Sequence, residues 1–123
     1  MKVEEITAIL TKEFGPISSK FTLLDLTMTQ ATQAHSEADR PGVYVYWKNG
    51  QVIKVGRHLT NARTRALKHI RDNTEGKMAA LKNDSKCHIL LYTLEPSACH
   101  WAAALEILFE GKLKPAIKSG RRG

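Results

Sequence analysis

Residues 42–56 read Gly-Val-Tyr-Val-Tyr-Trp-Lys-Asn-Gly-Gln-Val-Ile-Lys-Val-Gly, and this stretch decides the fold. Two runs rich in β-branched and aromatic residues flank Asn49-Gly50, a pattern that is typical of a β-hairpin. A three-residue loop with Gly50 left-handed would pair Tyr44 with Lys54 and give one fully apolar face. A two-residue Asn49-Gly50 turn would scatter polar groups over both faces, so the first register is favoured. We therefore expect the phenol of Tyr44 and the ammonium of Lys54 to lie side by side.

Helices and one further strand are predicted around the hairpin. Apolar residues at helical spacing predict an amphipathic helix over residues 3–14, ended by Gly15-Pro16. The segment 18–40 is interpreted as a loop with a short helix or strand. Beyond the hairpin the pattern predicts, in order, a helix over 60–72 capped by Thr60 or Asn61, a second helix over 75–83, a strand over 87–94 and a helix over 98–113 capped by Ser97. The expected fold is α/β of the α+β type: a small three-stranded antiparallel sheet flanked by helices, with an N-terminal helical extension.

The composition is that of a single globular domain. The chain has 123 residues, of which 42% are hydrophobic and 25% are charged, and this length suits one domain. No apolar run approaches the roughly 18 residues that a membrane span needs, and Glu4 and Glu5 stand where a signal peptide carries bases. Cys87 and Cys99 are too few for a disulfide framework. We expect a cytoplasmic protein with reduced thiols and no membrane contact.

The charge divides the chain at Arg40-Pro41-Gly42. Residues 1–40 hold four basic and six acidic residues, whereas residues 41–123 hold 15 basic and six acidic ones. The two parts are interpreted as an acidic N-terminal extension and a strongly basic domain. Such a domain suggests a polyanionic partner, nucleic acid above all. The alternative is a generic basic surface that keeps a small protein soluble.

The ordered motifs between residues 41 and 118 resemble those of the GIY-YIG nuclease domain. Gly42-Val43-Tyr44 matches the first triplet of that family, and Lys54-Val55-Gly56 matches the second, with Lys in place of Tyr. Arg65 and His69, four residues apart, match the pair on the helix that follows. The interval between the second triplet and Arg65 is one residue longer than is usual in the family.

A glutamate on the last helix completes the resemblance. Glu106 lies nine residues before Pro115, as in the nuclease domain of the family's excision-repair subunit, and Lys118 stands where that subunit has Asn. The resemblance implies a metal-dependent endonuclease that hydrolyses DNA phosphodiester bonds with Mg²⁺ or Mn²⁺. Glu106 would be the metal ligand, because Mg²⁺ prefers carboxylate and water oxygens, and Glu110 one turn further is the competing carboxylate.

Four further residues would act at the reacting phosphate. Arg65 can present a fork of donors to phosphate and stays charged at any relevant pH; the alternative is an ordinary surface arginine. Tyr44 is the family's candidate general base or water-orienting group, and a phenol with a pKa near ~10 needs nearby cations for that role. We expect Lys54 to polarise Tyr44 or to contact phosphate, and His69 to relay a proton or to hold Tyr44.

Basic residues around this set are predicted to bind DNA. They lie at the hairpin exit and on the following helix: Arg57, His58, Arg63, Lys68 and Arg71. The acidic residues 1–40 are instead expected to pack on the sheet or to bind a protein partner, including a second copy of the chain. Two functions stay open. One is an endonuclease, and the other is a binding module of the same fold with little or no cleavage, which the departures at Lys54 and Lys118 favour.

Overall fold

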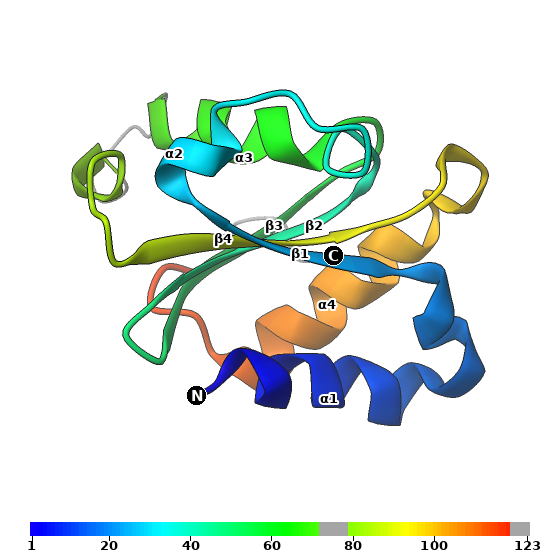
Figure 1. Ribbon diagram of the computed structural model, residues 1–123. Helices are drawn as coiled ribbons and strands as arrows, with labels where there is room; N and C mark the ends of the chain where they lie inside the picture. The colour runs from blue at the N-terminus through cyan, green and yellow to red at the C-terminus, as the bar shows by residue number, and fades with distance from the viewer. Residues whose placement is uncertain (72–78, 119–123) are drawn as a thin grey trace.

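The computed structural model describes residues 1–71 and 79–118, without the side chains of residues 69–71 and 79. In chain order its elements are α1 (Val3–Phe14), β1 (Thr22–Thr27), α2 (Met28–Ala31), β2 (Gly42–Lys48), β3 (Gln51–His58), α3 (Ala62–Arg71), β4 (Cys87–Thr93) and α4 (Trp101–Leu113), with 3₁₀ turns at Gly15–Lys20, Ala79–Leu81 and Pro96–Ala98. The centre is an antiparallel sheet with the strand order β1-β4-β2-β3. Helices α1 and α4 cover one face of the sheet, and α2 and α3 cover the other (Figure 1).

Within the described residues the sheet has four strands, so the prediction of three was wrong by one, while the α+β class is confirmed. The additional strand, β1, lies within residues 18–40 and pairs with β4 from Thr22 opposite Thr93 to Thr27 opposite His88. Asp25 interrupts its apolar residues, which weakens the local pattern that identifies a strand. The partner strand lies 61–71 residues further along the chain, so pairing at long range fixes β1 in the sheet.

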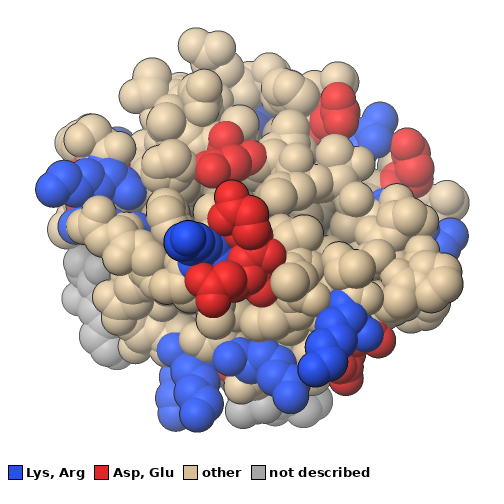
Figure 2. Space-filling model, turned by 60° about the horizontal axis from the view of Figure 1, so that its bottom comes forward, with Lys and Arg blue, Asp and Glu red and all other residues tan. Residues whose placement is uncertain are grey.

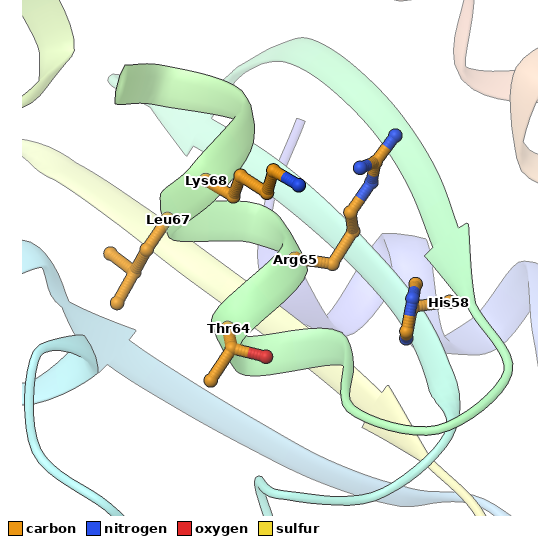
Figure 3. A pocket seen from close by; sticks show the side chains of 5 residues that line it. All are labelled: His58, Thr64, Arg65, Leu67 and Lys68. Carbon is orange, nitrogen blue, oxygen red and sulfur yellow. The ribbon is translucent and has the colours of Figure 1, made fainter. Parts of the chain in front are cut away.

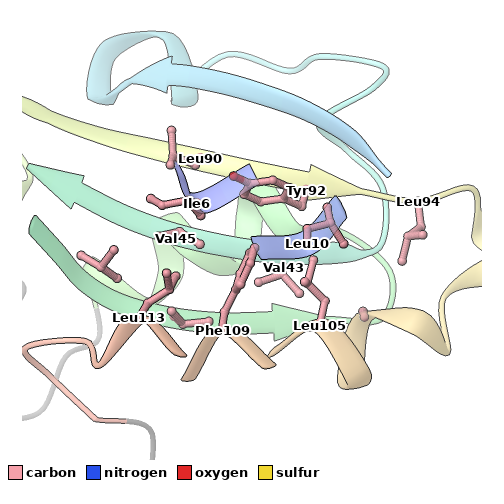
Figure 4. Packing of buried hydrophobic residues seen from close by; sticks show 13 residues of the cluster. Ile6, Leu10, Val43, Val45, Leu90, Tyr92, Leu94, Leu105, Phe109 and Leu113 are labelled. Carbon is pink, nitrogen blue, oxygen red and sulfur yellow. The ribbon is translucent and has the colours of Figure 1, made fainter. Parts of the chain in front are cut away.

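The first 40 residues build the same core as the rest of the chain. Helix α1 has the predicted bounds and turns its apolar stripe towards the sheet. Figure 4 shows Ile6 and Leu10 packed among Val43, Tyr92 and Phe109, which come from β2, β4 and α4. Packing on the sheet, one of the two alternatives for residues 1–40, holds for α1, while residues 22–27 form a strand of the sheet itself. The change of charge near residue 40 does not coincide with a boundary between two cores.

The hairpin has the predicted strands but a different turn. Asn49 and Gly50 both have positive φ (50° and 79°), and Lys48 pairs with Gln51. This is a two-residue turn of the kind that suits the twist of β-strands, rather than the expected three-residue loop. A β-bulge follows the turn. Val52 and Val55 lie three residues apart and would point to opposite faces of a regular strand, but the extra residue lets both join the core on the α1–α4 side.

The bulge changes which residues of the two strands face each other. Tyr44 lies opposite Gly56, and Tyr46 lies opposite Lys54. The predicted pairing of Tyr44 with Lys54 was therefore wrong. The error arose because a sequence of alternating residues does not indicate where an extra residue enters the ladder.

The other elements lie close to their predicted bounds. Asn61 caps α3, since its Oδ1 accepts the backbone N–H of Thr64 at 3.1 Å. Strand β4 matches the strand predicted over 87–94. Of the helix predicted over 75–83, residues 79–81 form a 3₁₀ turn, and residues 75–78 lie outside the described part.

The helix predicted over 98–113 is divided in two. A 3₁₀ turn at Pro96–Ala98 contains Ser97, and α4 begins only at Trp101. Ser97 therefore does not cap α4, and His100, which precedes that helix, makes no side-chain capping bond. Among the residues that the structure describes, no helix is long and apolar enough to cross a membrane.

Candidate functional site

A cavity of about 350 Å³ opens beside the end of β3. It is lined by the residue that ends β3 and by four residues from the first turns of α3: His58, Thr64, Arg65, Leu67 and Lys68. Figure 3 shows Arg65 lying between His58 and Lys68. Three of the predicted site residues are therefore brought together at one end of one strand. All three carry nitrogen donors suited to an anion.

The lining is positioned by local helix geometry. Residues three or four apart share a face of a helix, and this places Thr64 and Arg65 beside Lys68 on α3. Thr64 was missed from the sequence, although its spacing of four from Lys68 is the signal that identifies it. The cap at Asn61 fixes where the helix begins, and hence which side chains face the cavity.

His58 is held by the loop that leads into α3. Its Nδ1 accepts the backbone N–H of Asn61 at 3.0 Å and that of Thr60 at 3.3 Å. A ring nitrogen that accepts these bonds carries no proton, so in the neutral imidazole the proton is on Nε2. His58 thus reaches the cavity as a side chain of fixed orientation whose Nε2–H is a donor.

Arg65 carries an unsatisfied donor. Its Nε is buried and has no hydrogen-bond partner among the described residues. Buried donors are almost always paired in proteins, and a donor on a guanidinium has the most to gain from an anionic acceptor. An oxygen of a bound anion would satisfy this Nε.

The Tyr44 side chain is fixed by a glycine of the neighbouring strand. Tyr44 is only 1% exposed, and a Cβ added to Gly56 would lie 2.3 Å from both Cζ and Oη of its ring. Only a glycine leaves room for the ring at this position. The hydroxyl of Tyr44 therefore lies over Gly56, two residues before His58, at the same end of β3 as the cavity.

Lys54 has a different neighbour from the one predicted. It is buried at 6% exposure and lies opposite Tyr46 rather than Tyr44. The hydroxyl of Tyr46 donates to the carbonyl of Ala66 on α3, and burial raises the pKa of Tyr46 well above its usual 10.0. Tyr46 is therefore a neutral structural contact between β2 and α3. Lys54 is diagonal to Tyr44 across the ladder, within reach of long side chains only.

Glu106 lies on the opposite face of the sheet from the cavity. Along β3, Lys54, Gly56 and His58 face α3, whereas Val55 and Arg57 face α4. Arg57 Nη1 donates to Glu106 Oε1 at 2.5 Å, and the carboxylate is almost fully buried. Because β3 is at the edge of the sheet, the two faces meet along this strand. The predicted catalytic residues thus approach one edge from two sides.

The carboxylate predicted to bind a divalent cation is Glu106. In residues 1–71 and 79–118 no group of three or more His, Cys, Asp or Glu side chains could hold a metal ion. Mg²⁺ is commonly bound by one or two carboxylates, with waters and phosphate oxygens completing its shell. Glu106 fits that pattern once Arg57 leaves its Oε1. Glu110, one turn further on α4, is also buried and stays the competing carboxylate.

Arg63 serves the fold rather than the cavity. It is buried. Its Nε donates to Oδ1 of Asp39 at 2.5 Å, and its Nη1 donates to the carbonyl oxygen of Ala31 at 2.9 Å. Burial would raise the pKa of Asp39, but the guanidinium of Arg63 and the N–H of His35 outweigh it, and the pKa lies below its usual 3.8. The acidic partner is 24 residues away, so the sequence did not indicate this role.

Two further predicted site residues lie on α3, but their side chains are not among those that the structure describes. His69 and Arg71 lie in the last turn of this helix. Their side chains are outside the described part of the chain, and the roles predicted for them stay predictions.

The acidic residues of α1 lie on the other side of the sheet from the cavity. Glu4, Glu5 and Glu13 are exposed on this helix. Figure 2, in which the side of α1 and α4 comes forward, shows a group of acidic side chains near the middle of this face, with one basic side chain beside it and further basic ones along the lower edge. The fold thus keeps these three acidic residues away from the cationic cavity beside α3.

Comparison with known proteins gives no relative for the chain. No protein-family model matches it, and neither a curated protein nor a solved structure does. The function has to be inferred from the residues of this chain and from their geometry.

Proposed function

We propose that the chain is a metal-dependent endonuclease of the GIY-YIG type, which hydrolyses DNA phosphodiester bonds at the β3 edge of its sheet. The observation that carries the proposal is the buried Nε of Arg65, which finds no partner within the described part of the chain and lies in a residue that lines a cavity with His58 and Lys68. The strand that ends in this cavity also carries Arg57, which contacts the carboxylate of Glu106. A phosphate site and a carboxylate are both needed for metal-assisted hydrolysis.

The proposed roles follow from the chemistry of each side chain. Arg65 binds the phosphate as a fork, Lys68 adds a flexible point charge, and His58 donates from Nε2. Tyr44, held over Gly56, orients water at the same end of the strand. A divalent cation on Glu106 would supply charge for the developing negative oxygens.

The charge of the chain supports a long polyanion as substrate. The chain carries a net charge of +7, and the excess of basic residues lies after residue 40. A basic surface binds DNA by releasing counterions, so the affinity should fall steeply with salt. The same surface would concentrate DNA at the cavity without any sequence preference.

Nicking of supercoiled plasmid tests the proposal. The wild-type chain, Glu106→Gln and Arg65→Gln are compared in Mg²⁺ and in EDTA, with Lys112→Gln as the matched control on an exposed position of α4. We expect nicking only with Mg²⁺, a loss of about 100-fold or more in both site variants, and no change in the control. Equal nicking by the wild type and Glu106→Gln would refute the catalytic role of Glu106.

A binding module without cleavage is the second candidate. Three observations favour it. The guanidinium of Arg57 already pairs with the carboxylate of Glu106, and Lys54 stands where the family has a tyrosine. The predicted catalytic side chains of Tyr44, Lys54 and Glu106 are also all buried. In this case the plasmid stays intact, while binding that weakens with salt is lost in Arg65→Gln. Lys54→Tyr separates the two functions, because a gain of nicking in this variant identifies a weakened nuclease.

A further inference from the structure

The Arg57–Glu106 pair brings together two groups that the proposed reaction needs apart. Arg57 Nη1 lies 2.5 Å from Glu106 Oε1. The side chain of Glu106 is 5% exposed and that of Arg57 is 27% exposed, so the arginine has the route to solvent and the carboxylate does not. A metal ion approaching Glu106 meets a cation already in place.

Each partner of the pair is costly to expose alone. If a phosphate draws Arg57 away, Glu106 is left as a buried, uncompensated carboxylate that repels the same phosphate. If a metal ion binds Glu106 first, the guanidinium stays beside it as a like charge. Both costs vanish when phosphate takes Arg57 and metal takes Glu106 together. Binding of the two ligands is then mutually favourable, and the favourable coupling is the same in either direction.

We propose that Arg57 is a positioning residue that couples metal binding to DNA binding by exchanging Glu106 for a phosphate. The inference rests on the proposed function, because it assigns the metal to Glu106 and the phosphate to the β3 edge. It goes beyond that function by stating how metal binding and DNA binding depend on each other. Without DNA, the ion pair with Arg57 keeps a metal ion from binding the carboxylate of Glu106. With DNA, Arg57 turns to the phosphate and Glu106 becomes a ligand.

Mn²⁺ binding measured without reference to cleavage tests the exchange. The electron paramagnetic resonance signal of free Mn²⁺ is titrated with the full chain, first alone and then with a short DNA duplex whose own Mn²⁺ binding is measured separately. The proteins are the wild type, Arg57→Gln, the double variant Arg57→Gln/Glu106→Gln, and Lys112→Gln as a control for loss of a positive charge from α4.

Without DNA, Arg57→Gln should bind Mn²⁺ about tenfold more tightly than the wild type, whereas Lys112→Gln stays within about twofold and the double variant loses this binding. Adding the duplex should tighten Mn²⁺ binding about tenfold in the wild type and about threefold or less in Arg57→Gln. Equal Mn²⁺ affinity in Arg57→Gln and the wild type would overturn the proposal, as would wild-type affinity in the double variant.

Two arrangements keep the outcome unambiguous. If Arg57→Gln does not fold, Arg57→Lys takes its place, because a lysine keeps the charge but loses the guanidinium fork. It should bind Mn²⁺ severalfold more tightly than the wild type, and unchanged affinity would refute the exchange. Absence of plasmid nicking with the expected Mn²⁺ affinities would refute the nuclease alone. Nicking with equal affinities would refute the exchange alone.

Discussion

The missing side chain of Gly56 leaves room for the ring of Tyr44, and replacing this glycine tests whether the close contact fixes the position of the ring. Gly56 is buried and its φ is not positive, so alanine meets no backbone strain there. The obstacle is Tyr44, whose Cζ and Oη lie 2.3 Å from the added Cβ. The ring cannot move aside freely, because Tyr44 is only 1% exposed and its ring packs edge-on against that of Tyr46, with 5.8 Å between the ring centroids.

The magnitudes follow from packing. Overfilling a close-packed core costs about 1–3 kcal/mol, so Gly56→Ala should lower the free energy of unfolding by about 2 kcal/mol. Tyr44→Val removes a buried ring and should cost about 3 kcal/mol. In the Tyr44→Val background the clash is gone, and alanine in a strand is favoured over glycine by about 0.5–1 kcal/mol. The two substitutions should therefore be coupled by about 2–3 kcal/mol.

Urea unfolding of the wild type, both single variants and the double variant measures this coupling. The account predicts that Gly56→Ala destabilises the wild type but leaves Tyr44→Val unchanged or slightly more stable. Equal losses in the two backgrounds would refute the reasoning, because the alanine would then be meeting something other than the ring of Tyr44. The plasmid assay adds a functional readout, since Gly56→Ala displaces the hydroxyl proposed to orient water.

Three further predictions concern the frame around the site. Asp39→Asn removes the carboxylate that compensates buried Arg63 and should cost about 3 kcal/mol at neutral pH. The pKa of Asp39 is lowered below 3.8 in the folded chain, so its stabilising effect is present above 3.8 and is lost as the pH falls through the folded pKa. In urea unfolding, the difference in stability between the wild type and Asp39→Asn should therefore shrink as the pH falls below 3.8. Asn61→Ala removes the cap of α3 and should cost about 1 kcal/mol in thermal unfolding, whereas Asn61→Asp keeps an acceptor and should stay near the wild type. Burial raises the pKa of Cys87 to about 11, so a thiol reagent at mildly alkaline pH should modify half-buried Cys99 and spare Cys87; equal rates at both thiols would contradict this environment.

The parts of the fold that local pattern determines were predictable. The hairpin strands, α1 and α3 follow from periodicities of two and 3.6 within a few residues. The sequence left a short helix or strand open within residues 18–40, because the identity of β1 depends on pairing with β4, 61–71 residues further along the chain. The bulge was missed for a related reason: its benefit, the placement of both Val52 and Val55 in one core, appears only once α1 and α4 cover that face of the sheet.

The same division applies to the site. Arg65 and Lys68 share a face because they lie three residues apart on one helix, and His58 joins them because it ends the preceding strand. The contact between Arg57 and Glu106 spans 49 residues and two elements. No spacing rule connects such residues, so their pairing had to be seen in the fold.

The central claim is that phosphate at Arg65 and metal at Glu106 act at one edge of one strand. Paramagnetic broadening by Mn²⁺ in the ¹⁵N-labelled chain bound to DNA measures this most directly. The account predicts that backbone signals of Arg57, His58, Arg65 and Glu106 broaden together, and that Glu106→Gln abolishes the effect. Broadening centred elsewhere, or unchanged in Glu106→Gln, would contradict it.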